Sequence, residues 1–256
     1  MSAPLLEARG VGRRYGDYVA LQGVTLEVQP GETVAIVGPN GAGKTTLVNV
    51  LTGLLRPSEG QVRFRGADIA GIGPVRLARW GMARAFQLVQ VFPELTVAET
   101  IAVGALAQMG RGRRMLTSLG ADHQLQELVR ETAVAFGLEN ALHRPARELS
   151  QGQKKLLDVA SAFALRPAVI LLDEPTSGVA TADKHGIMRT LMEAARLAGV
   201  QALLLVEHDI DLVETYASRV VGLRGGQMLA DLPVRDFFAD AEVTAALVGR
   251  RPAKAH

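Results

Sequence analysis

The chain contains no cysteine. This absence excludes disulfides, thiol chemistry and cysteine-bound metal sites, and it agrees with a cytosolic setting. Long apolar runs are also missing, since the longest nearly continuous one is Val159 to Leu165 and a membrane-spanning helix needs about 20 such residues. The first residues lack a charged segment followed by an apolar one, so we expect no export signal.

A strong charge imbalance is absent as well, because the net charge is only +2. We therefore expect no nucleic-acid partner. The 256 residues, 48% of them hydrophobic and 21% charged, are typical of a folded soluble protein. This length suits one large domain, or one domain with an inserted lobe.

The most informative motif is glycine-rich and reads Gly38-Pro39-Asn40-Gly41-Ala42-Gly43-Lys44-Thr45-Thr46. It follows a strand-like run, Thr33 to Val37, and precedes a helix-like segment, Thr45 to Leu54. Glycines permit backbone conformations that aim several N–H groups at one point, and a helix N-terminus attracts anions to that point. Lys44 can then meet the β- and γ-phosphates of a nucleotide, and the hydroxyl of Thr45 can hold Mg²⁺. The alternative is a glycine-rich turn before an ordinary helix, which the strand and helix context disfavours.

The pattern of apolar residues changes along the chain. Residues 5–64 read as short alternating strands, and residues 97–163 show helical periodicity. Continuous apolar runs at 169–172 and 202–206 suit strands covered on both faces, and helix-like segments follow them at Thr181–Leu197 and Asp209–Tyr216. Repeated strand–helix units predict an α/β fold with a parallel sheet, whose ligands bind beyond the carboxyl ends of the strands.

Two acids, Asp173 and Glu174, end the apolar strand at Val169 to Leu172. A buried carboxylate is costly unless it is paired or close to a metal. Asp173 fits the carboxylate on the Mg²⁺ side of a phosphate-loop site, and Glu174 fits a general base for an attacking water. An acidic turn ahead of Pro175 is the alternative.

A further motif, Leu149-Ser150-Gln151-Gly152-Gln153, precedes a helix-like run from Lys154 to Leu165. Ser150 is a plausible N-cap, and Gly152 leaves backbone N–H groups approachable by an anion. Taken alone, this segment is better explained as a plain helix cap.

In this order, the motifs resemble those of the nucleotide-binding subunit of an ATP-binding-cassette (ABC) transporter, over a likeness from about Leu5 to Leu247. Residues 38–46 match the Walker A motif of that family, and residues 169–174 match Walker B. Residues 149–153 resemble the family signature, which is usually Leu-Ser-Gly-Gly-Gln.

Three single residues extend this resemblance. Gln87 matches the Q-loop glutamine, which in the family touches Mg²⁺ and the attacking water. His208 matches the switch histidine, which contacts the γ-phosphate. Tyr15 matches the aromatic residue that stacks on adenine, although an aromatic residue in an N-terminal strand is also commonly part of the core.

The resemblance implies a phosphate-loop NTPase (RecA-like) α/β core with an N-terminal antiparallel β subdomain and an inserted α-helical subdomain. We expect one ABC ATPase domain over residues 1–249, followed by a tail at 250–256. The core with its β subdomain would occupy 1–87 and 157–249, and the helical subdomain 88–156.

The resemblance also implies an ATPase that uses ATP and Mg²⁺. Thr45, Gln87 and Asp173 would hold the metal, and Glu174, His208 and Gln87 would serve the reaction. Two subunits would face head to tail, with each ATP between the Walker A residues of one and Ser150, Gly152 and Gln153 of the other. Transmembrane permease subunits would be the partners at the cytoplasmic face of the inner membrane, where this subunit would be peripheral, and a solute-binding protein would be an indirect partner.

Residues 80–87 and 92–100 resemble in particular the branched-chain amino acid uptake subfamily, whose relatives also import other small solutes. An exporter ATPase of the lipopolysaccharide type and a small-molecule kinase are the alternatives. Ser150, Gln153 and His208 in this order disfavour the kinase.

The sequence departs from the family at two positions. Gln151 replaces a glycine of the signature, which adds a side chain near the nucleotide of the partner subunit. Ala180 stands where the family usually has the D-loop aspartate, which helps to couple the two ATP sites of a dimer. The absence of this aspartate puts communication between the two sites in doubt. The basic stretch Arg111 to Arg114 is expected to be a solvated loop, with contact to lipid or a membrane partner as the alternative.

Overall fold

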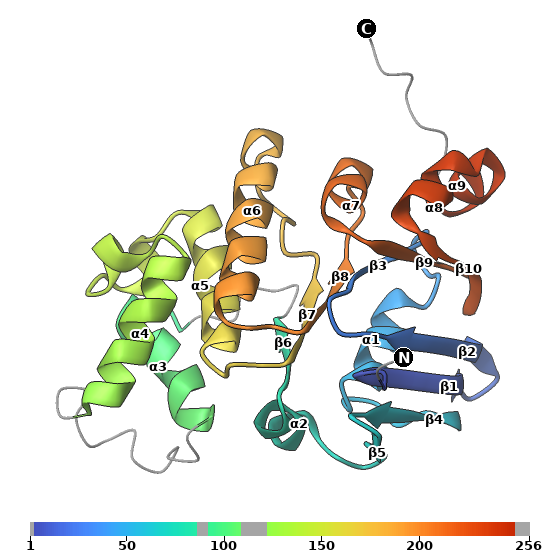
Figure 1. Cartoon of the computed structure of the whole chain (residues 1–256), viewed down its shortest axis with the longest axis horizontal. Helices are drawn as coiled ribbons and strands as arrows, with labels where there is room; N and C mark the ends of the chain where they lie inside the picture. The colour runs from blue at the N-terminus through green and yellow to red at the C-terminus, as the bar shows by residue number, and fades with distance from the viewer. Residues whose placement is uncertain (1–2, 86–91, 109–121, 249–256) are drawn as a thin grey trace, which may run out of the picture. The chain divides into compact units, whose positions relative to one another are not determined.

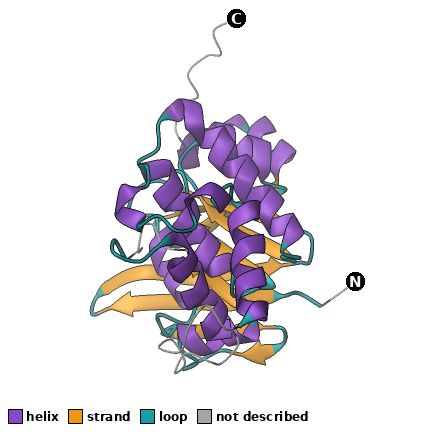
Figure 2. Ribbon diagram, turned by 90° about the vertical axis from the view of Figure 1, so that its left-hand side faces the viewer, coloured by secondary structure: helices purple, strands orange, loops and turns teal. Residues whose placement is uncertain are grey.

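The computed structural model describes residues 3–85, 92–108 and 122–248. It divides into two units, the first made of Met1–Pro74 and Gln201–His256 and the second of Val75–Val200 (Figure 1). Strands and helices are mixed through the described part (Figure 2). Gln87 and the stretch Arg111 to Arg114 lie outside the described residues. The subdomain boundaries expected from the sequence stay a prediction.

An antiparallel sheet opens the first unit, as predicted. Its order is β2-β1-β4-β5, formed by β1 (Leu6–Tyr15), β2 (Tyr18–Val28), β4 (Glu59–Phe64) and β5 (Ala67–Asp68). Val24, Leu26 and Val28 are buried, whereas Thr25 and Glu27 between them are exposed. This alternation, which the sequence shows directly, buries one face of the sheet.

A second set of strands in the first unit surrounds β3 (Thr33–Val37). β3 pairs in parallel with β8 (Ala202–Val206) on one side and β9 (Arg219–Arg224) on the other. β10 (Gln227–Pro233) pairs antiparallel with the outer edge of β9. All five residues of β8 are buried, which confirms the interpretation of this run as a covered strand.

Four helices accompany these strands within the described residues of this unit: α1 (Lys44–Leu51), α7 (Ile210–Tyr216), α8 (Val234–Ala239) and α9 (Ala241–Val248). Phe237 of α8 and Leu247 of α9 share one hydrophobic cluster with Val37. α1 ends at Leu51 rather than at the expected Leu54, because Thr52 caps it and Gly53 takes a φ of 70°.

Arg219, at the start of β9, joins three strands of the first unit. Its guanidinium donates to Glu32 before β3 (2.9 and 3.0 Å) and to Asp231 of β10 (2.6 Å). Burial disfavours the charged guanidinium, but the hydrogen bonds to these two carboxylates raise the pKa of Arg219 above its usual range. The network therefore fixes the amino end of β3, whose carboxyl end carries the glycine-rich loop.

The second unit contains a parallel strand pair and the longest helices. β6 (Met82–Ala85) pairs with β7 (Val169–Asp173). Its helices are α2 (Pro74–Trp80), which begins at the unit boundary, α3 (Val97–Gln108), α4 (His123–Ala135), α5 (Gln151–Phe163) and α6 (Thr181–Leu197). Two 3-10 turns, η2 (Glu139–Ala141) and η3 (Ala146–Glu148), lie between α4 and α5.

The helix faces of the second unit agree with the predicted periodicity. Leu125, Leu128, Val129 and Thr132 are buried along one face of α4. Phe136, just after α4, meets Phe163 of α5 edge to face, with ring centroids 5.1 Å apart. Within the described parts of the chain, no helix combines the length and the apolar character that a bilayer span requires.

The packing of α3 on α5 generates a stability prediction. A Cβ at Gly104 would lie 2.0 Å from the main-chain oxygen of Ser161. We expect Gly104→Ala to destabilise the fold by about 1–3 kcal/mol, because the overlap outweighs the better helix propensity of alanine. Chemical denaturation of the purified protein measures this change.

The matched control is Gly186→Ala in α6, where a Cβ would meet no atom within 4 Å. We expect this control to stabilise the protein by up to about 1 kcal/mol, from helix propensity alone. Equal effects of the two substitutions would contradict the close α3–α5 approach.

Candidate functional site

The glycine-rich loop lies directly beyond the carboxyl end of β3. Gly38, Gly41 and Gly43 have φ values of 148°, 78° and 101°, a region that other residues rarely adopt. Gly43 is the N-cap of α1 and provides no side-chain hydrogen bond to the helix. Because the first N–H groups of a helix have no partner inside it, the start of α1 offers them to an anion.

Two of these glycines also have no room for a side chain. A Cβ at Gly38 would lie 2.2 Å from the oxygen of Leu223 in β9, and one at Gly43 would lie 2.7 Å from the oxygen of Ala20 in β2. The middle of the loop, Pro39 to Gly41, is exposed, and so is Thr45 in the first turn of α1. The loop is therefore fixed at both ends and open in between.

Lys44 is buried, although it carries a charge. Its Nζ donates to the main-chain oxygens of Gly38 at 2.7 Å and Pro39 at 3.2 Å. These carbonyls keep the ammonium group of the predicted phosphate-binding lysine on the loop itself.

His208 follows β8 at the same edge of the sheet as this loop. Ile36 of β3 is in register with Val206 of β8, so Gly38 and His208 each lie two residues beyond that pair. His208 is exposed, and its backbone N–H donates to the buried carboxylate of Glu207 at 3.2 Å. The first unit thus brings the predicted switch histidine to the edge that carries the phosphate loop.

Tyr15 ends β1 in a tight hairpin opposite Tyr18. It is 45% exposed, so the alternative that it belongs to the core is wrong. The guanidinium of Arg13 lies 4.8 Å from its ring centroid. β2 continues from Tyr18 to Ala20, whose carbonyl packs against Gly43, and this continuity connects the exposed aromatic residue to the phosphate loop.

Asp173 lies in the second unit, at the end of β7, and only 4% of its side chain is exposed. One guanidinium nitrogen of Arg84, on the neighbouring strand β6, lies 2.6 Å from its Oδ2. The sequence predicted that a buried carboxylate here is paired or close to a metal, and the structure shows Asp173 in an ion pair with Arg84.

Glu174 adopts a left-handed backbone, with φ of 51°, which is strained for a residue other than glycine. Its carbonyl accepts hydrogen bonds from Ser177 N at 3.0 Å and from Nζ of the buried Lys155 at 3.3 Å. The adjacent acids thus have different surroundings, since Asp173 is buried and Glu174 is half-buried. Backbone strain of this kind is concentrated at functional sites.

The signature-like segment begins α5 through a capping box. Ser150 Oγ accepts from Gln153 N at 3.2 Å, and Gln153 Oε1 accepts from Ser150 N at 3.1 Å. The predicted N-cap is therefore confirmed. A Cβ at Gly152 would come no closer than 3.8 Å to Ile187, so contacts within this unit do not require a glycine there.

The two departures from the family pattern both lie on the surface. Gln151 is exposed at the first position of α5. Ala180 is exposed and is the N-cap of α6, where it provides no side-chain hydrogen bond. The missing aspartate therefore also removes a helix cap.

Arg84 and Lys155 were not singled out from the sequence. A signal existed for Arg84, because a charge inside a buried strand requires a partner and the end of β7 offers an acid. Lys155 had no comparable signal, since it contacts a backbone carbonyl. Tyr15, the loop and His208 belong to the first unit, whereas Asp173, Glu174, Ser150, Gly152 and Gln153 belong to the second. Gln87 is outside the described residues.

Comparison with known proteins adds independent evidence. A family model described as ABC transporter matches residues 21–177. The chain is 31% identical over 255 residues to a probable branched-chain amino acid transport ATP-binding protein LivG from Methanocaldococcus jannaschii, covering 96% of this chain and 97% of that protein. It is 32% identical over 236 residues to the high-affinity branched-chain amino acid transport ATP-binding protein LivG from Escherichia coli K12, covering 90% and 92%.

A phosphonates import ATP-binding protein, PhnC from Alcaligenes faecalis, is 35% identical over 234 residues, which covers 90% of this chain and 83% of that protein. Among solved structures, an ATP-binding cassette of an ABC transporter matches with a TM-score of 0.84 at 30% identity, covering 96% of this chain and 99% of that one. The ADP conformation of such a cassette gives a TM-score of 0.83 at 30% identity, covering 96% and 98%. These likenesses confirm the predicted phosphate-loop NTPase fold.

The loop geometry predicts the effect of adding one methyl group. We expect Gly38→Ala to abolish nucleotide binding, because its Cβ would overlap the Leu223 carbonyl and its φ of 148° disfavours alanine. Titration with a fluorescent ATP analogue measures the affinity.

Gly41→Ala is the matched control, since a Cβ there would meet no atom within 4 Å and only the φ of 78° is unfavourable. We expect it to weaken binding far less than Gly38→Ala. A larger loss of nucleotide affinity in Gly41→Ala than in Gly38→Ala would show that packing against β9 does not shape the loop.

Proposed function

The chain belongs to the ABC transporter family, and on that premise we propose that it drives import of branched-chain amino acids or related small solutes. As a member of this family it binds ATP and is an ATPase. The observation that carries the proposal is the likeness over nearly the whole chain to branched-chain amino acid transport subunits. The similarity to a phosphonate import subunit is why the cargo is stated as a class.

We assign the reaction to residues at two strand ends. A water oxygen bonds to the γ-phosphorus of ATP while the bond from that phosphorus to the bridging oxygen breaks, and ADP keeps the electron pair. Glu174 accepts the proton of the water as general base. The ammonium of Lys44 balances charge on the phosphates, and His208 contacts the γ-phosphate. Gln87 is proposed to orient the water.

Mg²⁺ is the metal that we propose. Thr45 offers an exposed hydroxyl in the first turn of α1, and Asp173 offers a carboxylate at the end of β7. Oxygen donors of this kind fit Mg²⁺, which binds through one or two carboxylates together with substrate phosphates. When bound, the ion neutralises charge that develops on the phosphate oxygens. Gln87 completes the proposed ligand set.

Tyr15 is the residue that we propose for adenine. Its exposed ring can stack on a base, and its hairpin leads along β2 to the carbonyl that packs on Gly43. We propose that Asn40 and Thr46 complete the nucleotide contacts through their backbone N–H groups. Pro39 and Ala42 belong to the proposed site through the turn between them, in which Ala42 N donates to the Pro39 carbonyl at 3.1 Å.

A second ATPase subunit, of the same or a related chain, is proposed to face this one head to tail. The start of α5, with Ser150, Gly152 and Gln153, would then approach the γ-phosphate bound by the partner. The capping box leaves other first-turn N–H groups of α5 for that contact, and Gly152 keeps the approach open. ATP would hold two such subunits together, and hydrolysis would release them.

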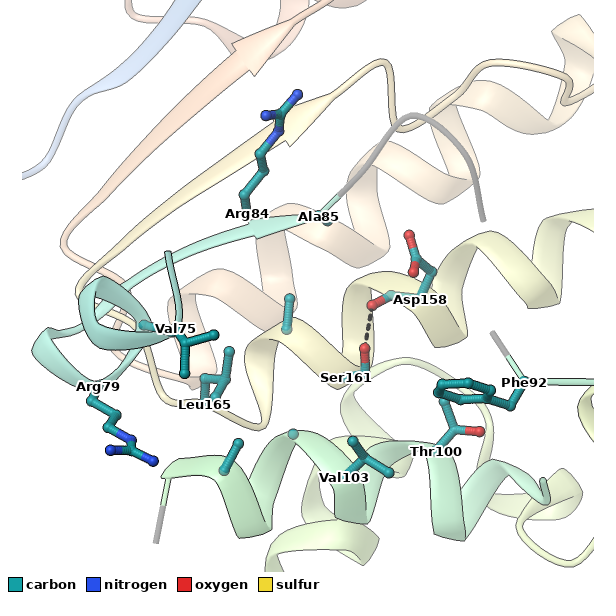
Figure 3. A pocket seen from close by; sticks show the side chains of 14 residues that line it. Val75, Arg79, Arg84, Ala85, Phe92, Thr100, Val103, Asp158, Ser161 and Leu165 are labelled. Atoms are coloured by element: carbon teal, nitrogen blue, oxygen red, sulfur yellow. Dashed lines mark hydrogen bonds between the residues drawn. The ribbon is translucent and has the colours of Figure 1, made fainter. Parts of the chain in front are cut away.

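Transmembrane permease subunits are the proposed membrane partners, with a solute-binding protein acting indirectly. The second unit offers the permease subunits a cavity of about 310 Å³, which lies between α2, β6, α3 and α5 (Figure 3). Val75, Val103 and Leu165 line it with Phe92, which is 61% exposed. Exposed apolar side chains of this kind are typical of contact sites. This arrangement would place the chain at the cytoplasmic face of the inner membrane.

The role of Glu174 is testable with the isolated subunit. We expect Glu174→Gln to slow ATP hydrolysis by roughly 10²–10⁴-fold, because the amide cannot accept the proton of the water. ATP binding should remain, since the loop of the first unit is unchanged. Phosphate release and fluorescent-nucleotide titration measure the two quantities.

Glu127→Gln, on the exposed face of α4, is the matched control and should hydrolyse ATP like the unaltered protein. Full turnover of Glu174→Gln would remove Glu174 as the base.

Transport itself is tested by co-purifying the chain from its native membranes and identifying the bound permease by mass spectrometry. We expect the reconstituted complex to take up labelled leucine, isoleucine or valine when supplied with ATP. The Glu174→Gln complex should assemble without uptake. Capture of a lipopolysaccharide-type export permease would contradict the proposed import. Uptake of phosphonates alone would exclude branched-chain amino acids as the cargo.

A further inference from the structure

We propose that Arg84 is a positioning residue for Asp173, holding one carboxylate oxygen so that the other faces the metal. This inference rests on the proposed function and adds a residue to it. Its starting observation is the ion pair between the second guanidinium nitrogen of Arg84 and Oδ2 of Asp173, at 2.6 Å.

Register brings the two residues together. Arg84 of β6 is paired with Leu171 of β7, and Asp173 lies two residues further along the same strand. Side chains two apart on a strand point to the same face. A long side chain at position 84 therefore reaches along β7 to its last residue, and a short one would not.

Burial makes this contact costly to lose. The side chains of Arg84 and Asp173 are only 9% and 4% exposed. A carboxylate removed from water needs a compensating charge, and deleting one partner of a buried pair leaves the other uncompensated. The guanidinium is planar and donates in fixed directions, so it constrains the rotation of the carboxylate as well as its charge.

The pairing leaves part of the carboxylate available. Across residues 3–85, 92–108 and 122–248, the structure gives Oδ2 of Asp173, and not Oδ1, a hydrogen-bond partner. A carboxylate with one oxygen fixed and the other open is the arrangement that a metal ligand requires from its supporting contacts.

The surroundings provide a matched control. Arg79 and Arg84 both line the 310 Å³ cavity. Figure 3 shows Arg84 leaving β6 away from Asp158 and Ser161, whereas Arg79 projects from α2 at the other end of the view. Arg79 is exposed, so removing it changes the cavity wall without touching the end of β7.

A purely structural ion pair and a positioning residue predict different effects on thermal stability and on the metal dependence of nucleotide binding. If Arg84 only joins β6 to β7, its removal lowers thermal stability and leaves the metal dependence of nucleotide binding unchanged. If Arg84 orients Asp173, replacing Arg84 raises the Mg²⁺ concentration that the folded protein needs for nucleotide binding. Arg84→Lys keeps the charge but loses the planar fork, and should recover only part of that response.

The experiment measures nucleotide binding in a Glu174→Gln background, which prevents hydrolysis. A fluorescent ATP analogue is titrated at increasing Mg²⁺ for the unaltered position 84, Arg84→Met, Arg84→Lys and Arg79→Met, and thermal unfolding is recorded without nucleotide. We expect the half-saturating Mg²⁺ concentration to rise roughly 10-fold or more in Arg84→Met. It should rise less in Arg84→Lys and remain unchanged in Arg79→Met.

An unchanged Mg²⁺ response in folded Arg84→Met would overturn the inference, as would an equal change in Arg79→Met. Where Arg84→Met fails to fold, Arg84→Lys decides in the same way, since an unaltered response there also overturns it. If the protein with Arg84 intact shows no Mg²⁺-dependent binding of the ATP analogue, the proposed function itself is wrong. That result differs from an unchanged Mg²⁺ dependence in the Arg84 variants, which contradicts only the role of Arg84.

Discussion

The main-chain packing around the glycine-rich loop is the constraint on which the first unit depends. Gly38 and Gly43 lie against the carbonyls of Leu223 and Ala20 at distances that exclude a Cβ. The loop is therefore held by backbone atoms of β9 and β2, together with the hydrogen bonds from Lys44 to its carbonyls. Because amides that bind a phosphate must point at one place before it arrives, this rigidity suits the loop to the phosphate binding proposed for it.

Several residues of the candidate site have a structural role beside the chemical role proposed for them. Lys44 satisfies loop carbonyls, and Ser150 and Gln153 cap α5. Both structural roles are compatible with the proposed contact to nucleotide, since Lys44 is held on the loop itself and a capped helix still has N–H groups at its start. The explanation of Ser150 as a plain cap and its explanation as a family signature residue are therefore compatible.

Elements with strong local signals could be predicted from the sequence. The helix at Thr181–Leu197 and the strand at Ala202–Val206 match their predicted bounds, because apolar periodicity and flanking breakers determine both. The loop at 38–46 and the cap at Ser150 were found from turn and capping chemistry. The sequence signalled that Arg84 needs an acidic partner, but it could not identify Asp173 as that partner. The contact depends on the register of β6 on β7, and a slip of one residue would turn the Arg84 side chain to the other face. The left-handed backbone of Glu174 was also hidden, since no residue preference marks it.

The surroundings of the two acids show how one strand end can give neighbouring carboxylates different tasks. Asp173 is buried against a cation from β6, whereas the carbonyl of Glu174 is held by a lysine from α5. The lysine therefore supports the main chain of Glu174, the residue proposed as the general base. Lys155 lies one turn after the capping box of α5. Because hydrogen bonds within the helix keep that turn rigid, α5 determines both the position of the Ser150 cap and the support of the proposed general base.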